Sequence, residues 1–126
     1  MSGFSFDSNI VIDALCGFDQ ARIEIERALA RGERLWVSRL AWIEVMSKGS
    51  GEGLRRAERF LEGFGIDEVD GEIGVRAAAL RRERPRLKTP DAIILATALT
   101  RGRVLVTRNT KDFPAEMPGI RVPYTL

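Results

Sequence analysis

Short segments of β-branched and aromatic residues alternate with segments of helical periodicity along this chain, and the alternation constrains its fold more than any other feature. Strands are predicted at residues 4–6, 35–37, 66–69 and 104–106, with an edge strand at 120–122. Helices are predicted directly after Asp7 and at residues 19–31, 39–48, 54–64, 72–84 and 89–99. We therefore expect an α/β fold, a three-layer α/β/α sandwich with a mostly parallel central sheet, forming one domain over residues 1–126.

Two of the predicted helices, at residues 39–48 and 92–99, are apolar on nearly every face. Such helices are typical of segments buried on two sides. The second is predicted to begin with Thr89 as N-cap and Pro90 as its first residue. Trp36 and Trp42 lie in apolar runs, so we expect them in the core rather than stacked on bases.

The absence of His and the presence of a single Cys limit the chemistry of a lone chain. They exclude the usual zinc sites, a Ser-His-Asp triad and an internal disulfide. Cys16 is expected to be a small core residue. The chain has no apolar run of membrane-spanning length, and its first residues do not resemble a signal peptide, so we expect a cytoplasmic protein with no membrane partner.

Four acids interrupt apolar segments where strands end or buried helices lie: Asp7, Glu44, Asp91 and Asp112. Three of them fall near the carboxyl ends of strands, where open parallel sheets bind ligands. Each also has a simpler interpretation as a turn residue, a helix cap or half of an i,i+4 ion pair. Four such coincidences are less plausible together than one acidic site, and clustered carboxylates without His or Cys suit Mg²⁺ or Mn²⁺.

Four motifs in this sequence resemble those of PIN-domain ribonucleases, most closely the VapC toxins of toxin-antitoxin pairs. They are Phe-Asp-Ser-Asn at 6–9, Ser38 followed by Glu44 in an apolar helix, Thr-Pro-Asp-Ala-Ile-Ile-Leu-Ala-Thr-Ala at 89–98, and Val-Thr-Arg-Asn-Thr-Lys-Asp-Phe at 106–113. Their order and spacing match from residue 4 to residue 113.

The resemblance implies a PIN-like fold and hydrolysis of RNA phosphodiester bonds with Mg²⁺ or Mn²⁺ as cofactor. It makes Asp7, Glu44, Asp91 and Asp112 the catalytic, metal-binding cluster. Ser8, Asn9, Thr107 and Asn109 become its supporting polar groups. Asp7 and Asp91 are the first choices as direct ligands, whereas the number of ions stays open. The resemblance also implies a cognate antitoxin and a homodimer.

A basic stretch precedes Asp91, although the net charge of the chain is only +2. The candidates for contacts with RNA phosphates are Arg82, Arg84, Arg86 and Lys88, together with Arg108 in the last motif. A solvated helix end explains the same stretch equally well. The apolar stripe in the predicted helix 54–64 is interpreted as core or as part of a groove for a partner helix.

Two alternatives of other classes remain. A catalytically silent RNA-binding or interaction module would keep the fold without the chemistry. A phospho-accepting receiver domain has similar length and class, but it needs paired acids after its first strand, where this chain has Asp7 alone.

Overall fold

The computed structural model describes residues 3–113 and 116–126. In chain order its elements are β1 (Phe4–Phe6), α1 (Ser8–Leu15), α2 (Asp19–Ala30), β2 (Leu35–Ser38), α3 (Arg39–Met46), α4 (Gly51–Leu61), β3 (Gly65–Asp67), α5 (Gly71–Glu83), α6 (Thr89–Arg101), β4 (Val104–Val106) and β5 (Ile120–Arg121). The strands and helices alternate as the sequence predicts, including the edge strand near the C-terminus.

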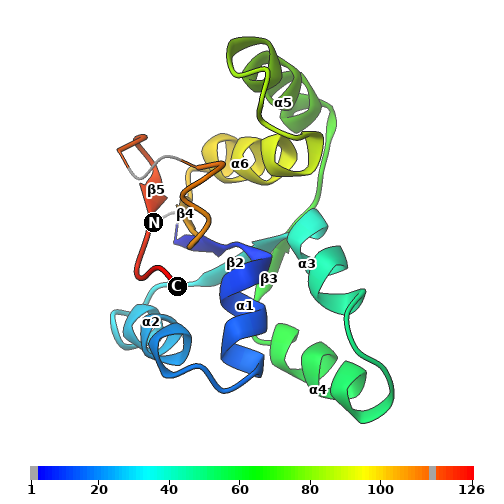
Figure 1. Ribbon diagram of the computed structural model, residues 1–126, viewed down its shortest axis with the longest axis vertical. Helices are drawn as coiled ribbons and strands as arrows, with labels where there is room; N and C mark the ends of the chain where they lie inside the picture. Colours follow the sequence, from blue (N-terminus) through cyan, green and yellow to red (C-terminus); the bar gives the residue numbers. More distant parts are fainter. Residues whose placement is uncertain (1–2, 114–115) are drawn as a thin grey trace.

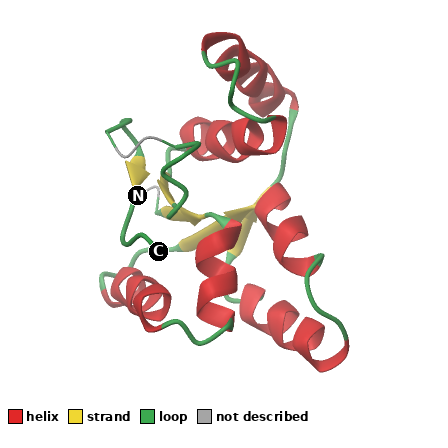
Figure 2. Cartoon of the chain, viewed as in Figure 1, coloured by secondary structure: helices red, strands yellow, loops and turns green. Residues whose placement is uncertain are grey.

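The five strands form one parallel sheet in the order β3-β2-β1-β4-β5. β1 lies at its centre, with Phe4 opposite Leu35 of β2 on one side and Val104 of β4 on the other. Helices cover both faces, with α5 and α6 on one and α1, α2 and α4 on the other (Figures 1 and 2). The predicted three-layer sandwich is confirmed.

Each face of the sheet has its own apolar core. Phe6, Ile10 and Val11 belong to the core beneath α1, α2, α3 and α4, whereas Leu95 and Leu105 belong to the core beneath α5 and α6. Because the strands are parallel, their carboxyl ends all lie at one edge. Asp7, Ser38 and Thr107 occupy that edge on three neighbouring strands.

Three local predictions about the helices are corrected by the structure. The apolar helix α3 is not buried on two sides, because Ala41 and Val45 face the core while Ile43 is 47% exposed. Cys16 is exposed as the C-cap of α1 rather than buried. Helix α6 is buried as expected, but its N-cap is Lys88, and Thr89 is already its first residue.

Trp36 lies on the sheet in a close-packed site. A Cβ atom at Gly65 would come within 2.5 Å of its ring, and the guanidinium of Arg103 stacks 3.7 Å from the ring centroid. The indole of Trp36 is only half-buried and belongs to neither apolar core, so the predicted core position is wrong for Trp36. The half-buried Trp42 does pack against the core beneath α1, α2, α3 and α4. Among the helices in the described residues, none is long and apolar enough to cross a membrane.

Candidate active site

Asp7 connects the central strand to the first helix. Its backbone is extended at the N-cap position of α1, and its carboxylate accepts a hydrogen bond of 2.8 Å from the backbone N–H of Ser8. The Oγ1 of Thr107 and the Nδ2 of Asn9 also donate to it, at 2.8 Å and 3.2 Å. Burial, with only 4% of the residue exposed, raises the pKa of Asp7 despite these bonds, and the nearby charge of Glu44 raises it further.

Thr107 reaches Asp7 because β1 and β4 are neighbours in the sheet. Its buried hydroxyl also accepts from the backbone N–H of Asn109 at 3.0 Å and from Nδ2 of Asn9 at 3.4 Å. One hydroxyl thus organises three polar residues from two distant motifs. The contacts place Asn9, Thr107 and Asn109 beside Asp7.

Glu44 extends from α3 toward the start of α1. The hydroxyl of Ser8 donates a 2.8 Å hydrogen bond to its Oε1 atom. Glu44 and Ser8 both line a surface cavity of about 490 Å³, together with Asn9, Ile12, Ser47, Lys48 and Arg108. The acid in the middle of this apolar helix therefore faces a cavity beside Asp7.

Asp91 lies in the first turn of α6. Its pKa is raised to about 6, first by burial and then by the negative charges of Asp112, Asp7 and Glu44. Asp112 lies in the turn after β4, where it accepts from Nδ2 of Asn109 at 2.9 Å. The structure thus places Asp91 within electrostatic reach of the other three predicted acids.

The oxygen atoms of this cluster fit a hard divalent cation such as Mg²⁺ or Mn²⁺. Burial and, after it, repulsion by the neighbouring acids raise the pKa of Asp91, and a bound cation would relieve the repulsion. Within residues 3–113 and 116–126, however, no three acidic or Cys side chains already stand as ligands of a single ion.

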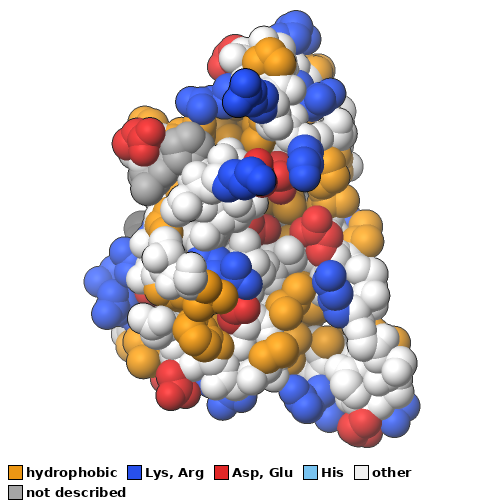
Figure 3. Space-filling view, in the orientation of Figure 1, with side chains coloured by type: hydrophobic (Ala, Val, Ile, Leu, Met, Phe, Trp, Pro, Cys, Tyr) orange, Lys and Arg blue, Asp and Glu red, His pale blue; other side chains and the backbone are white. Residues whose placement is uncertain are grey.

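The residues predicted to bind RNA phosphates lie in different parts of the surface. Arg84 and Arg86 line a small cavity of about 140 Å³ that reaches Asp112, and Lys111, which the sequence analysis missed, completes its basic wall. Arg82 lines a different cavity, between α5 and α6. Figure 3 shows acidic side chains near the centre of this face of the molecule, with Lys and Arg side chains on either side.

Lys88 is exposed at the start of α6. Arg108 lies in the cavity beside Glu44 and forms a two-pronged ion pair with Asp13, of 2.6 Å and 3.1 Å. The sequence analysis also missed Asp13. The sequence does contain a signal for Asp13, because this acid interrupts an apolar helix in the same way as Glu44 does.

A family model for the PIN domain matches residues 5–115. The chain belongs to the PIN domain family. This confirms the predicted family and fold, and the sheet order excludes the receiver-domain alternative, whose strand order is 2-1-3-4-5. None of the curated proteins compared with this PIN domain matches it.

Solved structures similar to this PIN domain come from toxin-antitoxin complexes. A chain of a toxin-antitoxin complex from Klebsiella pneumoniae is 39% identical, with a TM-score of 0.88 over 98% of this chain and all of that one. A chain of VapBC2 from Rickettsia felis, bound to promoter DNA, is 21% identical, with a TM-score of 0.78 over 94% of this chain and 95% of that one. A chain of DNA-bound VapBC from Salmonella typhimurium is 23% identical, with a TM-score of 0.76 over 96% of both chains.

Proposed function

We propose that this PIN domain is a metal-dependent endoribonuclease and the toxin of a toxin-antitoxin pair, acting in the cytoplasm. The observation that carries the proposal is the convergence of Asp7, Glu44, Asp91 and Asp112 at one edge of the sheet, with the pKa of Asp91 raised by burial and by the charges of the other three. Such a site has oxygen ligands for a metal that would activate water and neutralise charge on the phosphate.

Asp7 and Asp91 are the direct ligands in this proposal. Glu44 and Asp112 either contact the ion, orient its water molecules or hold a second ion. When bound, Mg²⁺ or Mn²⁺ supplies a water molecule of lowered pKa and neutralises charge on the phosphate. Thr107 and Asn9 orient the Asp7 carboxylate through the hydrogen bonds that they donate to it.

Ser8 and Asn109 have the same supporting role for the other two acids. Ser8 holds Oε1 of Glu44, and Asn109 holds Oδ2 of Asp112. The RNA strand is bound through its phosphates by Arg84, Arg86 and Lys88 on one side of the acids and by Arg108 on the other, with Arg82 more distant.

The activity is tested with purified protein and a structured RNA. Cleavage is expected with Mg²⁺ or Mn²⁺ and is expected to disappear in EDTA. Asp91→Asn should remove most of the cleavage, whereas Glu58→Gln, which removes an equal charge from the exposed face of α4, should leave it unchanged. Cleavage that persists in EDTA would overturn the metal mechanism, and RNA binding without cleavage would favour the silent module.

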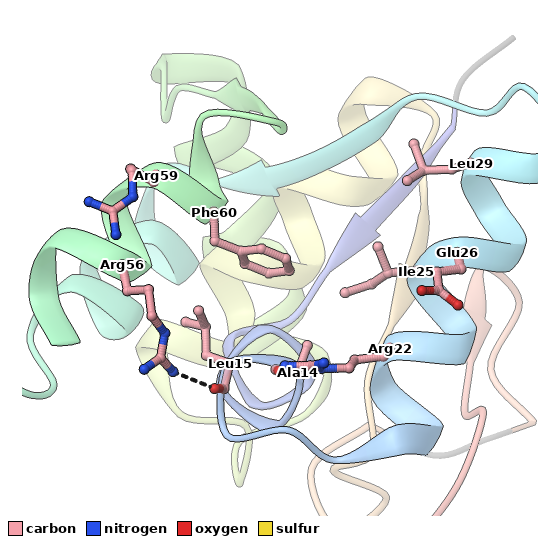
Figure 4. A pocket seen from close by; sticks show the side chains of 9 residues that line it. All are labelled: Ala14, Leu15, Arg22, Ile25, Glu26, Leu29, Arg56, Arg59 and Phe60. Carbon is pink, nitrogen blue, oxygen red and sulfur yellow. Dashed lines mark hydrogen bonds between the residues drawn. The ribbon is translucent and has the colours of Figure 1, made fainter. Parts of the chain in front are cut away.

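The antitoxin is proposed to bind the groove shown in Figure 4. This cavity of about 540 Å³ lies between α1, α2 and α4, and apolar side chains including Ile25, Leu29 and Phe60 line it. Arg22, Arg56 and Arg59 also line it, against a single acid, Glu26. An apolar segment flanked by acidic residues is complementary to this groove.

Two exposed residues of α2 provide a matched test. Leu29 lines the groove and is 55% exposed, whereas Ile23 is 53% exposed and does not line it. After co-expression with a small open reading frame from beside its gene, Leu29→Glu should lose co-purification of the partner and Ile23→Glu should retain it. If both variants retain the partner equally, the antitoxin binds at another surface.

The homodimer is proposed to form through α5 and α6. Val75 of α5 is 72% exposed, and Val69, Ala77, Ala78 and Ile93 line an open cavity of about 580 Å³ between these helices, together with Arg81 and Arg82. A second copy would cover the apolar part of this surface. Val75→Glu should shift the mass measured by light scattering from dimer to monomer, and an unchanged mass would exclude this surface.

A further inference from the structure

Asp13 joins three segments that are far apart in the sequence. Its carboxylate accepts hydrogen bonds from Nε and Nη2 of Arg108, at 2.6 Å and 3.1 Å, and from the hydroxyl of Tyr124, at 2.7 Å. Asp13 lies in α1, Arg108 follows β4, and Tyr124 lies near the C-terminus. The catalytic roles proposed above do not account for this contact between the buried Tyr124 and Asp13.

The contacts give the trio one defined arrangement. Burial alone would raise the pKa of Asp13, but the hydrogen bonds from Arg108 and Tyr124 bring it below its ordinary value, so Asp13 stays charged. Burial and the bond to Asp13 raise the pKa of Tyr124, which keeps its hydroxyl protonated as a donor. The ring of Tyr124 packs 5.2 Å from that of Phe18, which limits its movement.

Arg108 connects this trio to the acidic cluster. Its side chain lines the cavity of about 490 Å³ that also contains Ser8 and Glu44. Its backbone N–H lies 3.4 Å from Oδ1 of Asn9, whose Nδ2 donates to Asp7. The guanidinium therefore borders the cavity beside the proposed metal ligands.

We propose that Asp13 and Tyr124 are positioning residues that hold the Arg108 guanidinium at the wall of this cavity, where it donates to an RNA phosphate beside the one that is cleaved. The inference rests on the proposed function. A guanidinium has five N–H donors, so the two-pronged pair with Asp13 leaves others for a phosphate. A side chain held in place before binding loses less conformational freedom when RNA arrives.

Tyr124→Phe is the cleanest test, because it removes one hydroxyl group and no charge. With Mn²⁺ and an RNA oligonucleotide as substrate, we expect the KM to rise about 3- to 10-fold, which is the range for the loss of one ordinary hydrogen bond, while kcat stays within about twofold. The Kd for the same RNA in EDTA should rise by a similar factor. An unchanged KM and Kd would overturn the inference.

A second ion pair provides the control for effects of net charge and of stability. Glu24 of α2 accepts a two-pronged pair from Arg121 of β5, so Glu24→Gln and Asp13→Asn remove the same charge and the same kind of contact. Asp13→Asn should raise the KM, whereas Glu24→Gln should not. If both variants change the KM alike, the effect comes from net charge or stability, and the positioning role is wrong.

A double-mutant cycle separates positioning from folding. In the Arg108→Ala background, Tyr124→Phe should have no further effect on KM or Kd, because the side chain that it positions is gone. A full additive effect in that background would overturn the inference. If the wild type binds RNA in EDTA but does not cleave it with Mn²⁺, the proposed nuclease function fails while the Kd series still decides the positioning role; a wild type that binds no RNA overturns both.

Discussion

Asp91→Asn should make the metal-free protein more stable at neutral pH. Raising the pKa of a carboxyl group from 3.8 to about 6 destabilises its charged form by about 3 kcal/mol. Asp91 is only partly buried, so solvent screening reduces this to about 1–2 kcal/mol, or about 3–8 °C in Tm for a domain of this size. The amide removes the charge while nearly keeping the shape of the side chain.

The pH dependence of that gain follows from the direction of the pKa change. Because the folded pKa exceeds the unfolded one, the folded wild type binds more protons between pH 4 and pH 6 and loses stability as the pH rises through that interval. The advantage of Asp91→Asn should therefore be small near pH 4 and complete above pH 7.

Urea denaturation followed by circular dichroism in EDTA, at pH 4 and pH 7.5, measures this gain. Glu58→Gln serves as the control for net charge, and it should show no comparable gain. Adding Mn²⁺ at constant ionic strength should then stabilise the wild type more than Asp91→Asn. A loss of stability in Asp91→Asn at pH 7.5, or a gain as large at pH 4, would refute the electrostatic reasoning.

Three further outcomes are expected. At a Mn²⁺ concentration well below saturation, cleavage should decline as the pH falls through about 6, because the same aspartate must lose its proton to bind a cation. A pH–rate profile that is flat between about pH 5 and pH 8 under these conditions would contradict this. Thr107→Val should lower the stability by about 1–3 kcal/mol and also reduce cleavage. Thr97→Val removes a buried hydroxyl that bonds to a helix carbonyl, and it should lower the stability alone. Cleavage assays on both folded variants test this difference. Replacing Arg84 and Arg86 with Gln should flatten the slope of log affinity for RNA against log salt concentration by about 1 per lost phosphate contact. Arg82→Gln should flatten the slope less. Equal slopes would support the interpretation of this stretch as a solvated helix end.

Local sequence signals were sufficient for the order of the elements and for the edge of the sheet where the acids lie. They were insufficient for α3, because a helix that is apolar all round has no periodicity to show which face is buried. Ala41 and Val45 face inward and Ile43 outward because of how α3 packs against α1 and α4, and residue spacing within α3 does not contain that information.

Contacts between distant residues were the other part that the sequence could not provide. Asp13 and Tyr124 are 111 positions apart, and neither carries a motif that names the other. Their meeting depends on the β4–β5 pairing, which brings the end of the chain back past α1. Arg108 was predicted as a phosphate ligand from its place in a motif, but its ion pair became visible only in three dimensions.

Asp7 illustrates why the choice of residue decides what a substitution can reveal. It is a member of the acidic cluster and also the N-cap of α1, where it accepts from Ser8, Asn9 and Thr107. Replacing it changes charge, helix capping and a buried hydrogen-bond network together, so a loss of activity would not separate chemistry from folding. Asp91 has a raised pKa through burial and the charges of its acidic neighbours, and it lies in the first turn of α6, whose N-cap position is occupied by Lys88. The charge of the site can therefore be changed at Asp91 with less disturbance of the fold than at Asp7.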